Sequence, residues 1–315
     1  WEVLIMVKIL VSDGMDKEAL NKLVEDGYEV IDKHFDEEEL KNRIKEFDVI
    51  VIRSATKIRK PLIDAAKNGN LKLIIRGGVG VDNIDVDYAL QNGIAVKNTP
   101  NASAASVAEL TLAHMFAISR YVNISNVTMR NNEWHKSQYK GVELYGKTLG
   151  IIGFGRIAKE VAKRASALGM KIIYTDKLGM AKGYNNYEFC EFKDVLKRAD
   201  YVTFHIPFSK GQKALIGEKE FDIMKDGVYI INCARGGIID EKALINALDS
   251  GKVAGAGIDV FENEPSPCEE LLNNDRVSAT PHIGASTCEA QKRIGMEIVN
   301  IVEQYYHDKN LINVC

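Results

Sequence analysis

The sequence predicts an α/β protein built from two parallel sheets, each doubly wound with helices on both faces. Short runs of β-branched and apolar residues alternate with helical patterns along most of the 315 residues. One helical pattern, over 103–121, is too long for a simple crossover and interrupts the alternation. Because strands that alternate with helices form parallel sheets, the interruption separates two such series.

The first series precedes the long helical pattern. Pro61 stands at the first turn of one expected helix, which ends near Lys67, and amphipathic patterns predict helices over 16–25 and 36–47. The expected strands are 7–11, 28–31, 48–52, 71–75 and 94–97. Roughly 95 residues in this order suffice for one compact layered domain.

The second series begins after a polar, Asn-rich stretch around 123–132. Its expected strands are 148–152, 171–175, 201–206, 228–232, 255–259 and 277–280. A last helix, over about 288–306, follows this second sheet, and its pattern alone allows it to pack on either domain.

The composition is that of a globular protein. Lys and Arg number 41 against 44 Asp and Glu, a net charge of −3, and 46% of residues are hydrophobic, which excludes disordered, collagen-like and coiled-coil classes. We therefore expect no nucleic-acid or membrane partner, and any anionic ligand must be held by a few placed cations. No apolar stretch approaches the roughly 18 residues of a membrane span.

The ends of the chain and its cysteines indicate the compartment. Residues 1–5 lack the basic region, apolar core and cleavage site of a signal peptide, so we expect a cytoplasmic protein. The five cysteines form no C-x-x-C pair, which argues against a zinc site and a disulfide framework. We expect free thiols and no metal at Cys190, Cys233, Cys268, Cys288 and Cys315.

The segment GFGRIA, residues 153–158, carries the most specific signal. It follows an expected strand and opens a helix, as the G-x-G-x-x-G/A dinucleotide fingerprint does. Gly153 permits the tight turn, and Gly155 lets a pyrophosphate approach the helix N-terminus. Asp176 ends the next strand, 23 residues after Gly153, where a carboxylate binds the ribose hydroxyls and favours NAD over NADP. The alternative is a glycine turn in a protein that binds no nucleotide.

Three ionisable residues stand where parallel strands end. Arg235, Glu264 and His282 each follow an expected strand of the second series. Reversible hydride transfer to a carbonyl needs a proton donor that titrates near neutrality, a cation for an adjacent carboxylate, and a carboxylate that keeps an imidazole charged. Each residue alone is more often structural, so the prediction rests on their joint placement beside a nucleotide fold.

Four blocks carry a family resemblance: GFGRIAKEVAKRASALGMKIIYTD, INCARGGIIDEKAL, GAGIDVFENEP and TPHIGAST. They resemble, in order and separation, the D-isomer-specific 2-hydroxyacid dehydrogenases, over nearly the whole chain from Val7. The resemblance implies that Arg235 binds the substrate carboxylate and carbonyl, that His282 is the general acid/base, and that Glu264 stabilises its charged form. It also implies NAD as cofactor, held by Gly153, Gly155, Arg156, Ile157, Asp176, Ile206, Cys233, Ala234, Asp259 and Gly284. Ala158 replaces the commoner third glycine, a mild departure that should change helix packing only slightly.

Two segments of the first domain indicate which class of substrate the protein binds. The segments IRSATK from Ile52 and IRGGVGVDN from Ile75 resemble those of the phosphoglycerate dehydrogenases in this family. Arginines at the ends of neighbouring parallel strands can converge on one dianionic phosphate, and a glycine-rich turn can offer amides to a carboxylate. The expected substrate-binding residues are Arg53, Arg76, Gly77, Gly78 and Val79. Alternatively, the two arginines are solvated or paired with Asp82 or Asp85.

The resemblance also implies an organisation and an activity. A flavodoxin-like substrate domain, 6–98 plus 288–315, would flank a Rossmann NAD-binding domain, 99–287, with a cleft between them. The expected reaction is NAD-dependent oxidation of 3-phospho-D-glycerate to 3-phosphooxypyruvate, the entry to serine synthesis, by a homodimer that lacks the C-terminal serine-binding module of some relatives. A hydroxypyruvate or glyoxylate reductase is the main alternative, and a corepressor that binds NAD without catalysis is a distant one.

Overall fold

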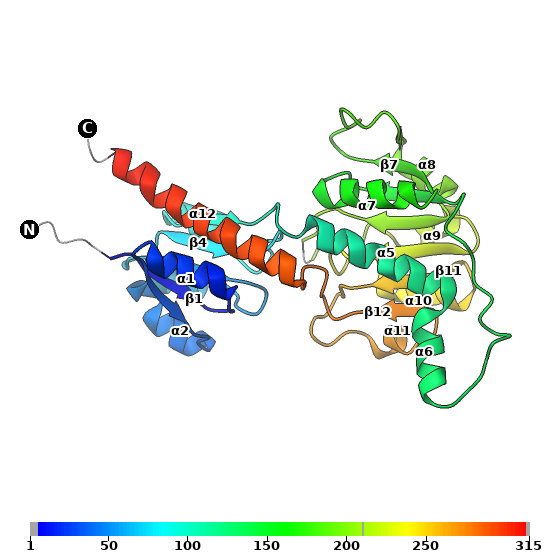
Figure 1. The fold of residues 1–315 in the computed structure, drawn as a ribbon, viewed down its shortest axis with the longest axis horizontal. Helices are drawn as coiled ribbons and strands as arrows, with labels where there is room; N and C mark the ends of the chain where they lie inside the picture. The colour runs from blue at the N-terminus through cyan, green and yellow to red at the C-terminus, as the bar shows by residue number, and fades with distance from the viewer. Residues whose placement is uncertain (1–5, 210, 313–315) are drawn as a thin grey trace, which may run out of the picture. The chain divides into compact units, whose positions relative to one another are not determined.

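The computed structural model describes residues 6–209 and 211–312. It divides into two compact units: unit 1 is Trp1–Ser103 with Ala285–Cys315, and unit 2 is Ala104–Gly284. Figure 1 shows the chain leaving unit 1 for unit 2 and returning with its last helix.

Unit 1 contains a five-stranded parallel sheet in the order β2-β1-β3-β4-β5. The strands are β1 (Lys8–Val11), β2 (Glu29–Asp32), β3 (Val49–Ile52), β4 (Leu73–Arg76) and β5 (Ala95–Asn98). The helices are α1 (Lys17–Glu25), α2 (Glu37–Arg43), α3 (Lys60–Ala66), α4 (Val86–Gln91) and α12 (Cys288–Ile312), with a 3₁₀ turn η1 (Ile44–Glu46) after α2.

The alternation of side chains along β3 explains why unit 1 has helices on both faces of its sheet. All four residues of β3 are buried, and successive side chains point to opposite faces. Ile50 and Ile52 pack into the core under α2, α3 and α4, whereas Val49 and Val51 pack under α1 and α12. The expected doubly wound first domain is thus confirmed.

Helix α12 packs on unit 1, which settles what its sequence pattern left open. Ile294, Ile298 and Val302 belong to the same core as β1, β3 and β4. Gly295 permits close contact with α1, because a Cβ at this position would lie 2.6 Å from the Cβ of Ala19. Helix α12 therefore completes the domain whose first strand is β1.

Unit 2 contains a seven-stranded parallel sheet in the order β12-β11-β10-β9-β6-β7-β8. The strands are β6 (Thr148–Ile152), β7 (Lys171–Thr175), β8 (Glu188–Phe189), β9 (Tyr201–Phe204), β10 (Val228–Asn232), β11 (Val253–Ile258) and β12 (Val277–Ala279). The helices are α5 (Ala104–Arg120), α6 (Val122–Arg130), α7 (Arg156–Ala167), α8 (Phe192–Arg198), α9 (Glu218–Ile223), α10 (Glu241–Asp249) and α11 (Glu269–Leu272).

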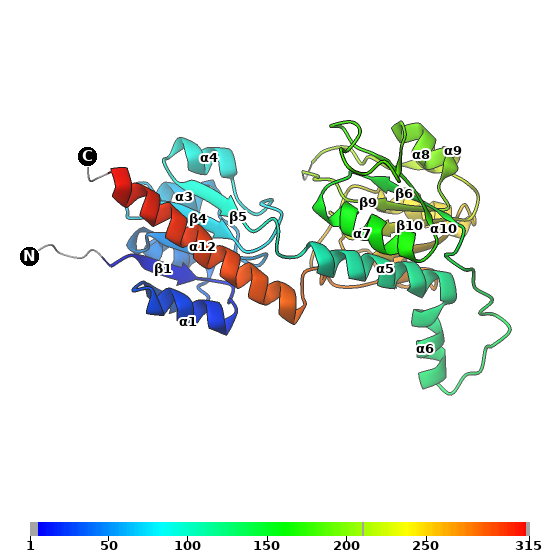
Figure 2. The same cartoon turned by 45° about the horizontal axis from the view of Figure 1, so that its top comes forward.

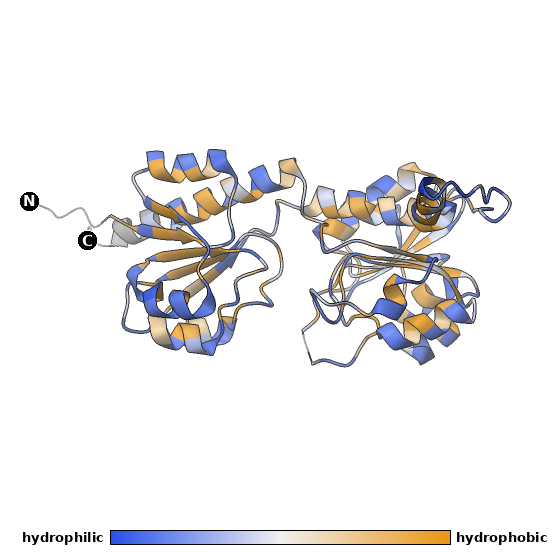
Figure 3. Cartoon of the chain, turned by 90° about the horizontal axis from the view of Figure 1, so that it is seen from below, coloured by the Kyte–Doolittle hydropathy of each residue, from blue (hydrophilic) through white to orange (hydrophobic). Residues whose placement is uncertain are grey.

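The strand order of unit 2 reverses between β6 and β9, which is the topological switch point of the sheet. Helices α5 and α7 cover one face, and α8, α9 and α10 cover the other (Figure 2). In both units the apolar strands lie between helices whose outer sides are hydrophilic (Figure 3). Ligands of such sheets bind outside the carboxyl ends of the strands at the switch point.

Two elements of unit 2 were not expected from the sequence. Helix α6 lies within the polar, Asn-rich stretch, and only Thr128 of this helix is buried, so the helix contributes little to the core of unit 2. Strand β8 has two residues, too few for a visible alternation. The expected strand 201–206 is shorter, because the chain leaves the sheet after Phe204.

Three further observations concern membrane spans, metal sites and the cysteines. Within the described residues, no helix is long and apolar enough to cross a membrane. The same part of the chain places no group of three or more His, Cys, Asp or Glu side chains where a metal ion could be held. Cys190, Cys233, Cys268 and Cys288 are free thiols, and Cys315 lies outside the described residues.

Candidate active site

The fingerprint turn of unit 2 follows β6 at the switch point. Gly153 adopts a φ of +84°, and a Cβ there would lie 2.6 Å from the carbonyl oxygen of His205. Only glycine therefore allows the turn to contact the segment that leaves β9. Because the same Cβ would also lie 2.6 Å from Cγ2 of Ile206, the structure brings two of the predicted cofactor residues together.

The start of α7 has the features of a dinucleotide site. A Cβ on Gly155 would meet no atom within 4 Å, so packing inside the protein does not require glycine at this position. Arg156 and Ile157 begin α7, where first-turn amides have no partner within the helix. The open space at Gly155, directly before these amides in the chain, fits a pyrophosphate at the helix N-terminus, and Ala158 is fully buried.

Asp176 is held in place by two backbone amides. Its Oδ2 accepts a hydrogen bond from the N–H of Phe154 (2.7 Å), and its Oδ1 accepts one from Leu178 (2.8 Å). The carboxylate is thus fixed between the fingerprint turn and the turn after β7. A fixed carboxylate beside the fingerprint fits the adenosine ribose of NAD.

His282 and Glu264 form a hydrogen-bonded pair. Nδ1 of His282 lies 2.8 Å from Oε2 of Glu264, and both side chains are partly exposed. The backbone of His282 adopts a φ of +53°, an uncommon conformation for a residue with a side chain, and its N–H donates to the carbonyl of Asp259. The pair leaves Nε2 of the imidazole for another partner.

The pKa of Glu264 lies below its ordinary value for physical reasons visible in the structure. Partial burial opposes ionisation, but the hydrogen bond and charge of His282, the amide of Phe261 and the charge of Arg235 together outweigh it. The carboxylate form is therefore favoured next to the imidazole. This is the charge state that a partner of an imidazolium requires.

Arg235 is positioned by the loop after β10. The side chain of Asn232, which is buried, donates to the carbonyl of Arg235 (2.8 Å) and accepts from the N–H of Ala234 (3.1 Å). A Cβ on Gly236 would lie 1.8 Å from the carbonyl oxygen of Phe261, so only glycine lets this loop contact the segment that carries Glu264. Arg235 and Glu264 are thereby brought close together.

Asp259 directly follows β11, and its buried carboxylate accepts three hydrogen bonds from described residues. Oδ1 accepts from Thr280 Oγ1 (2.6 Å) and from the N–H of Ile283 (2.8 Å), and Oδ2 accepts from the N–H of Gly284 (2.9 Å). This carboxylate fixes the segment that contains His282. Nearby, at the end of β10, burial raises the pKa of Cys233, so its thiol is not ionised.

In unit 1 the predicted arginines come from neighbouring strands. Ile52 of β3 pairs with Arg76 of β4, so Arg53 follows the same end of the sheet at which Arg76 lies. A Cβ on Gly77 would lie 3.6 Å from Cγ of Arg53. Gly78 leaves room for Nη1 of Arg76, which lies 3.4 Å from the carbonyl of Gly77.

The loop that carries Arg53 is held by two residues that sequence reasoning missed. Asp13 accepts hydrogen bonds from the amides of Arg53 (2.7 Å) and Thr56 (3.0 Å). Asn83 donates to the carbonyls of the same two residues, both at 2.7 Å. Asp13 follows β1, so its place after a strand was the signal that could have revealed it.

The chain is similar to known proteins over most of its length. Residues 112–284 match the family model described as D-isomer specific 2-hydroxyacid dehydrogenase, NAD binding domain. The chain belongs to this family of dehydrogenases. Its predicted fold class, two parallel-sheet α/β domains, and its predicted cofactor, NAD, are confirmed.

Three relatives illustrate the range of this family. The chain is 48% identical over 298 residues to a hydroxypyruvate reductase of Thermotoga maritima, covering 93% of this chain and 96% of that one. It is 44% identical to a D-3-phosphoglycerate dehydrogenase of Methanocaldococcus jannaschii, covering 98% of this chain but only 59% of that enzyme. A glyoxylate reductase structure from Paecilomyes thermophila superposes with a TM-score of 0.85 at 35% identity, covering 94% of each chain.

The lowered pKa of Glu264 gives this dehydrogenase a testable pH dependence. A carboxylate with a depressed folded-state pKa stabilises the fold above its unfolded value of 4.5, and this contribution is lost as the pH falls through the folded value. Glu264→Gln should therefore lower the urea midpoint more at about pH 6 than at about pH 3. Glu269→Gln, at the exposed start of α11, is the control. An equal effect of Glu264→Gln on the urea midpoint at both pH values would show that the pKa of Glu264 is not lowered in the folded protein.

Proposed function

We propose that this dehydrogenase oxidises 3-phospho-D-glycerate to 3-phosphooxypyruvate, the reaction that leads into serine synthesis. The observation that carries the proposal is the pair of arginines at the ends of β3 and β4. Arg53 and Arg76 lie at the same end of neighbouring strands in unit 1, where two guanidinium groups can hold a phosphate in charge-assisted hydrogen bonds. The amides of Gly77, Gly78 and Val79 are proposed to bind the carboxylate.

The acid/base chemistry is assigned to unit 2. Because Glu264 holds Nδ1 of His282, Nε2 is the atom proposed to take the proton from the C2 hydroxyl of the substrate. The charge of Glu264 stabilises the resulting imidazolium. Arg235 is proposed to hold the carboxylate and polarise the oxygen on C2. NAD, when bound, supplies the acceptor for the hydride that leaves C2.

The cofactor is proposed to lie along the carboxyl ends of β6, β7 and β10. The amides of Arg156 and Ile157 would hold its pyrophosphate, and Asp176 its adenosine ribose. A carboxylate at this position repels the 2′-phosphate of NADP, which favours NAD. The nicotinamide end would contact a set of residues after β9, β10, β11 and β12: Ile206, Cys233, Ala234, Asp259 and Gly284.

Reduction of hydroxypyruvate is the second candidate. Its support is the 48% identity to the Thermotoga maritima hydroxypyruvate reductase, which this chain matches over 96% of that enzyme's length. A reductase of this kind uses the same acid/base pair but needs no phosphate-binding residues. The two candidate functions therefore differ in whether Arg53 and Arg76 bind a phosphate group of the substrate.

We also propose that the protein is a homodimer through α6 and the segment that follows it. Val122, Val127 and Met129 of α6 are each more than half exposed, and Trp134 is exposed as well. Figure 2 shows α6 extending away from the sheet of unit 2. Exposed apolar side chains in this number are typical of a surface that a second copy covers.

Light scattering at micromolar concentration should give twice the mass of one chain. Val127→Lys combined with Met129→Lys should give the mass of one chain, because two charges from each chain would have to be buried in the interface. Leu178→Lys, at an exposed apolar residue elsewhere in unit 2, should leave the dimer intact. A wild-type protein that scatters as a monomer would exclude the interface.

Replacement of His282 tests the proton-transfer role. His282→Ala should reduce turnover by about 10²- to 10⁴-fold, the usual contribution of a general base, with little change in NAD affinity. The assay follows NADH formation from 3-phospho-D-glycerate, and replacing NAD by NADP should lower the rate of the wild type. Glu269→Gln, at the exposed start of α11 and away from the proposed site and interface, is the control. Unchanged turnover in His282→Ala would refute the assignment.

Replacement of Arg53 distinguishes the two substrates. Arg53→Ala should raise KM about 10- to 100-fold for 3-phospho-D-glycerate and far less for D-glycerate, because only the first offers a phosphate. Arg59→Ala, which removes an arginine that binds Asp85 in the same unit, is the matched control. Equal effects on the two substrates would exclude the phosphate-binding role, and turnover of hydroxypyruvate alone would favour the reductase.

A further inference from the structure

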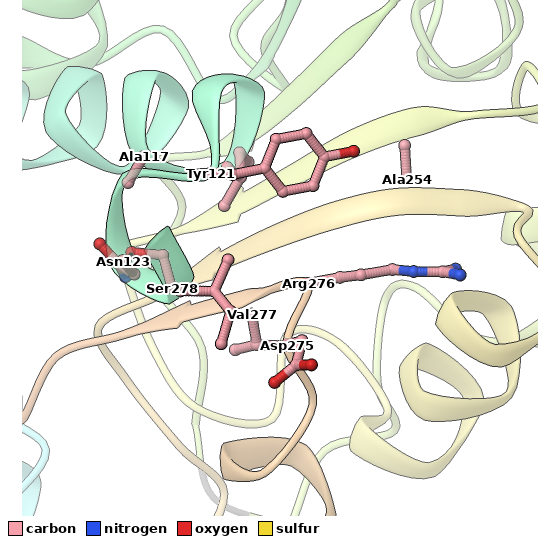
Figure 4. A pocket seen from close by; sticks show the side chains of 10 residues that line it. Ala117, Tyr121, Asn123, Ala254, Asp275, Arg276, Val277 and Ser278 are labelled. Carbon is pink, nitrogen blue, oxygen red and sulfur yellow. Dashed lines mark hydrogen bonds between the residues drawn. The ribbon is translucent and has the colours of Figure 1, made fainter. Parts of the chain in front are cut away.

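A continuous chain of polar side chains joins the start of α6 to Asp259. Four hydrogen bonds connect its members: Asn123 Nδ2 to Ser278 Oγ (2.6 Å), Ser278 Oγ to His114 Nδ1 (2.8 Å), His114 Nε2 to Thr280 Oγ1 (3.0 Å), and Thr280 Oγ1 to Asp259 Oδ1 (2.6 Å). Figure 4 shows the outer end, where Asn123 and Ser278 line a small pocket with room for about one water molecule.

The inner members of this chain are buried. His114 and Asp259 are 2% and 1% exposed. In the helical pattern over 103–121, His114 occupies a position on the apolar side, where a sequence alone suggests a core residue. A buried imidazole with partners on both ring nitrogens requires a more specific explanation, because such groups are stable only when each hydrogen bond is satisfied.

Glycine in β11 makes room for this histidine. A Cβ on Gly257 would lie 2.5 Å from the Cβ of His114, so α5 can approach the sheet at this point only over glycine. The close approach carries the imidazole to Ser278 and Thr280, on either side of the end of β12. The position of His114 is therefore built into the packing of α5 on β11.

The directions of the hydrogen bonds follow from the chemistry of the two ends. The carboxylate of Asp259 can only accept, so the single hydroxyl proton of Thr280 points to Asp259. Thr280 must then accept from His114, which places a proton on Nε2. Burial lowers the pKa of His114, although the charge of Asp259 opposes this, so the ring is neutral and Nδ1 accepts from Ser278. Ser278 in turn accepts from Asn123, which can donate.

We propose that His114 is a positioning residue for the cofactor, acting through Thr280 on the carboxylate of Asp259. The inference rests on the proposed contact of Asp259 with the nicotinamide carboxamide. With Oδ1 occupied by Thr280 and Ile283, the rotamer of Asp259 is fixed. Within the part of the chain that the structure describes, Oδ2 accepts from the amide of Gly284 alone and keeps a lone pair for a ligand donor. Without the Nε2 donor of His114, the hydroxyl of Thr280 would be held less firmly. The carboxylate of Asp259 would then lose one of the constraints on its orientation.

Two replacements of His114 separate its two hydrogen bonds. In His114→Gln the side-chain amide reaches the place of Nε2 and still donates to Thr280, whereas in His114→Asn it reaches only the place of Nδ1. Titration calorimetry with NAD should give a Kd within about twofold of wild type for His114→Gln and about tenfold weaker for His114→Asn. Equal Kd values for the two variants would overturn the proposal.

A control on the same helix measures general damage to α5. Ser119 is buried and bonds to Tyr201, away from the chain of hydrogen bonds described above. Ser119→Ala should lower the melting temperature but leave the Kd for NAD within about twofold. If Ser119→Ala weakens NAD binding as much as His114→Asn, the role of His114 is structural and the proposal fails.

The coupling between His114 and Thr280 is tested by a double variant. Thr280→Val removes the hydroxyl that carries the effect, so His114→Asn should add no further loss of NAD affinity in its presence. Additive losses would show that His114 does not act through Thr280. A wild type that binds no NAD would instead refute the proposed cofactor site, which separates the two failures.

The tautomer of His114 can be measured on the wild-type protein, so this test does not depend on whether a variant folds. Nitrogen NMR of ¹⁵N-histidine-labelled protein should show His114 as a neutral ring with its proton on Nε2 at neutral pH. A proton on Nδ1, or a charged ring, would reverse the assigned hydrogen bonds and overturn the proposal.

Discussion

The candidate active site depends on one buried charge, the carboxylate of Asp259. A buried carboxylate is stable only when it is well hydrogen bonded, and Asp259 accepts from one hydroxyl and two backbone amides. Those amides belong to Ile283 and Gly284, directly after His282, and the carbonyl of Asp259 accepts from the N–H of His282 itself. The segment is thus held on both sides of the histidine, which accounts for its uncommon positive φ.

Glycines determine which loops can meet around this centre. Gly236 lets the loop of Arg235 contact the backbone of Phe261, and Gly153 lets the fingerprint turn contact the segment that follows β9. In each case a side chain would strike a backbone carbonyl oxygen, of Phe261 or of His205, so a change of rotamer in a neighbouring residue could not make room for it. The contacts between loops from different strands are therefore specified by the absence of side chains as much as by their presence.

The sequence alone was sufficient to predict those elements that depend on a local residue pattern. The buried strands, the fingerprint and the charged residues that follow strands could all be predicted, because their patterns depend on short stretches of chain. Helix α6 could not, since its exposed apolar residues give no stripe facing a core. Asn232 and His114 were missed for another reason: each acts through partners that are distant in the sequence or through the backbone of a loop, and such contacts leave no spacing to recognise.

Three histidines of unit 2 show why residue type alone does not assign a role. His282 is partly exposed and bonds to a carboxylate, so it can exchange a proton with a ligand. Burial lowers the pKa of His205 to about 3, and this ring stays neutral. His114 is also buried, but its two nitrogens join two hydroxyl groups, so its fixed proton can transmit orientation rather than charge. The role of each histidine therefore depends on its exposure and its hydrogen-bond partners. These decide whether the imidazole transfers protons or holds another group in place.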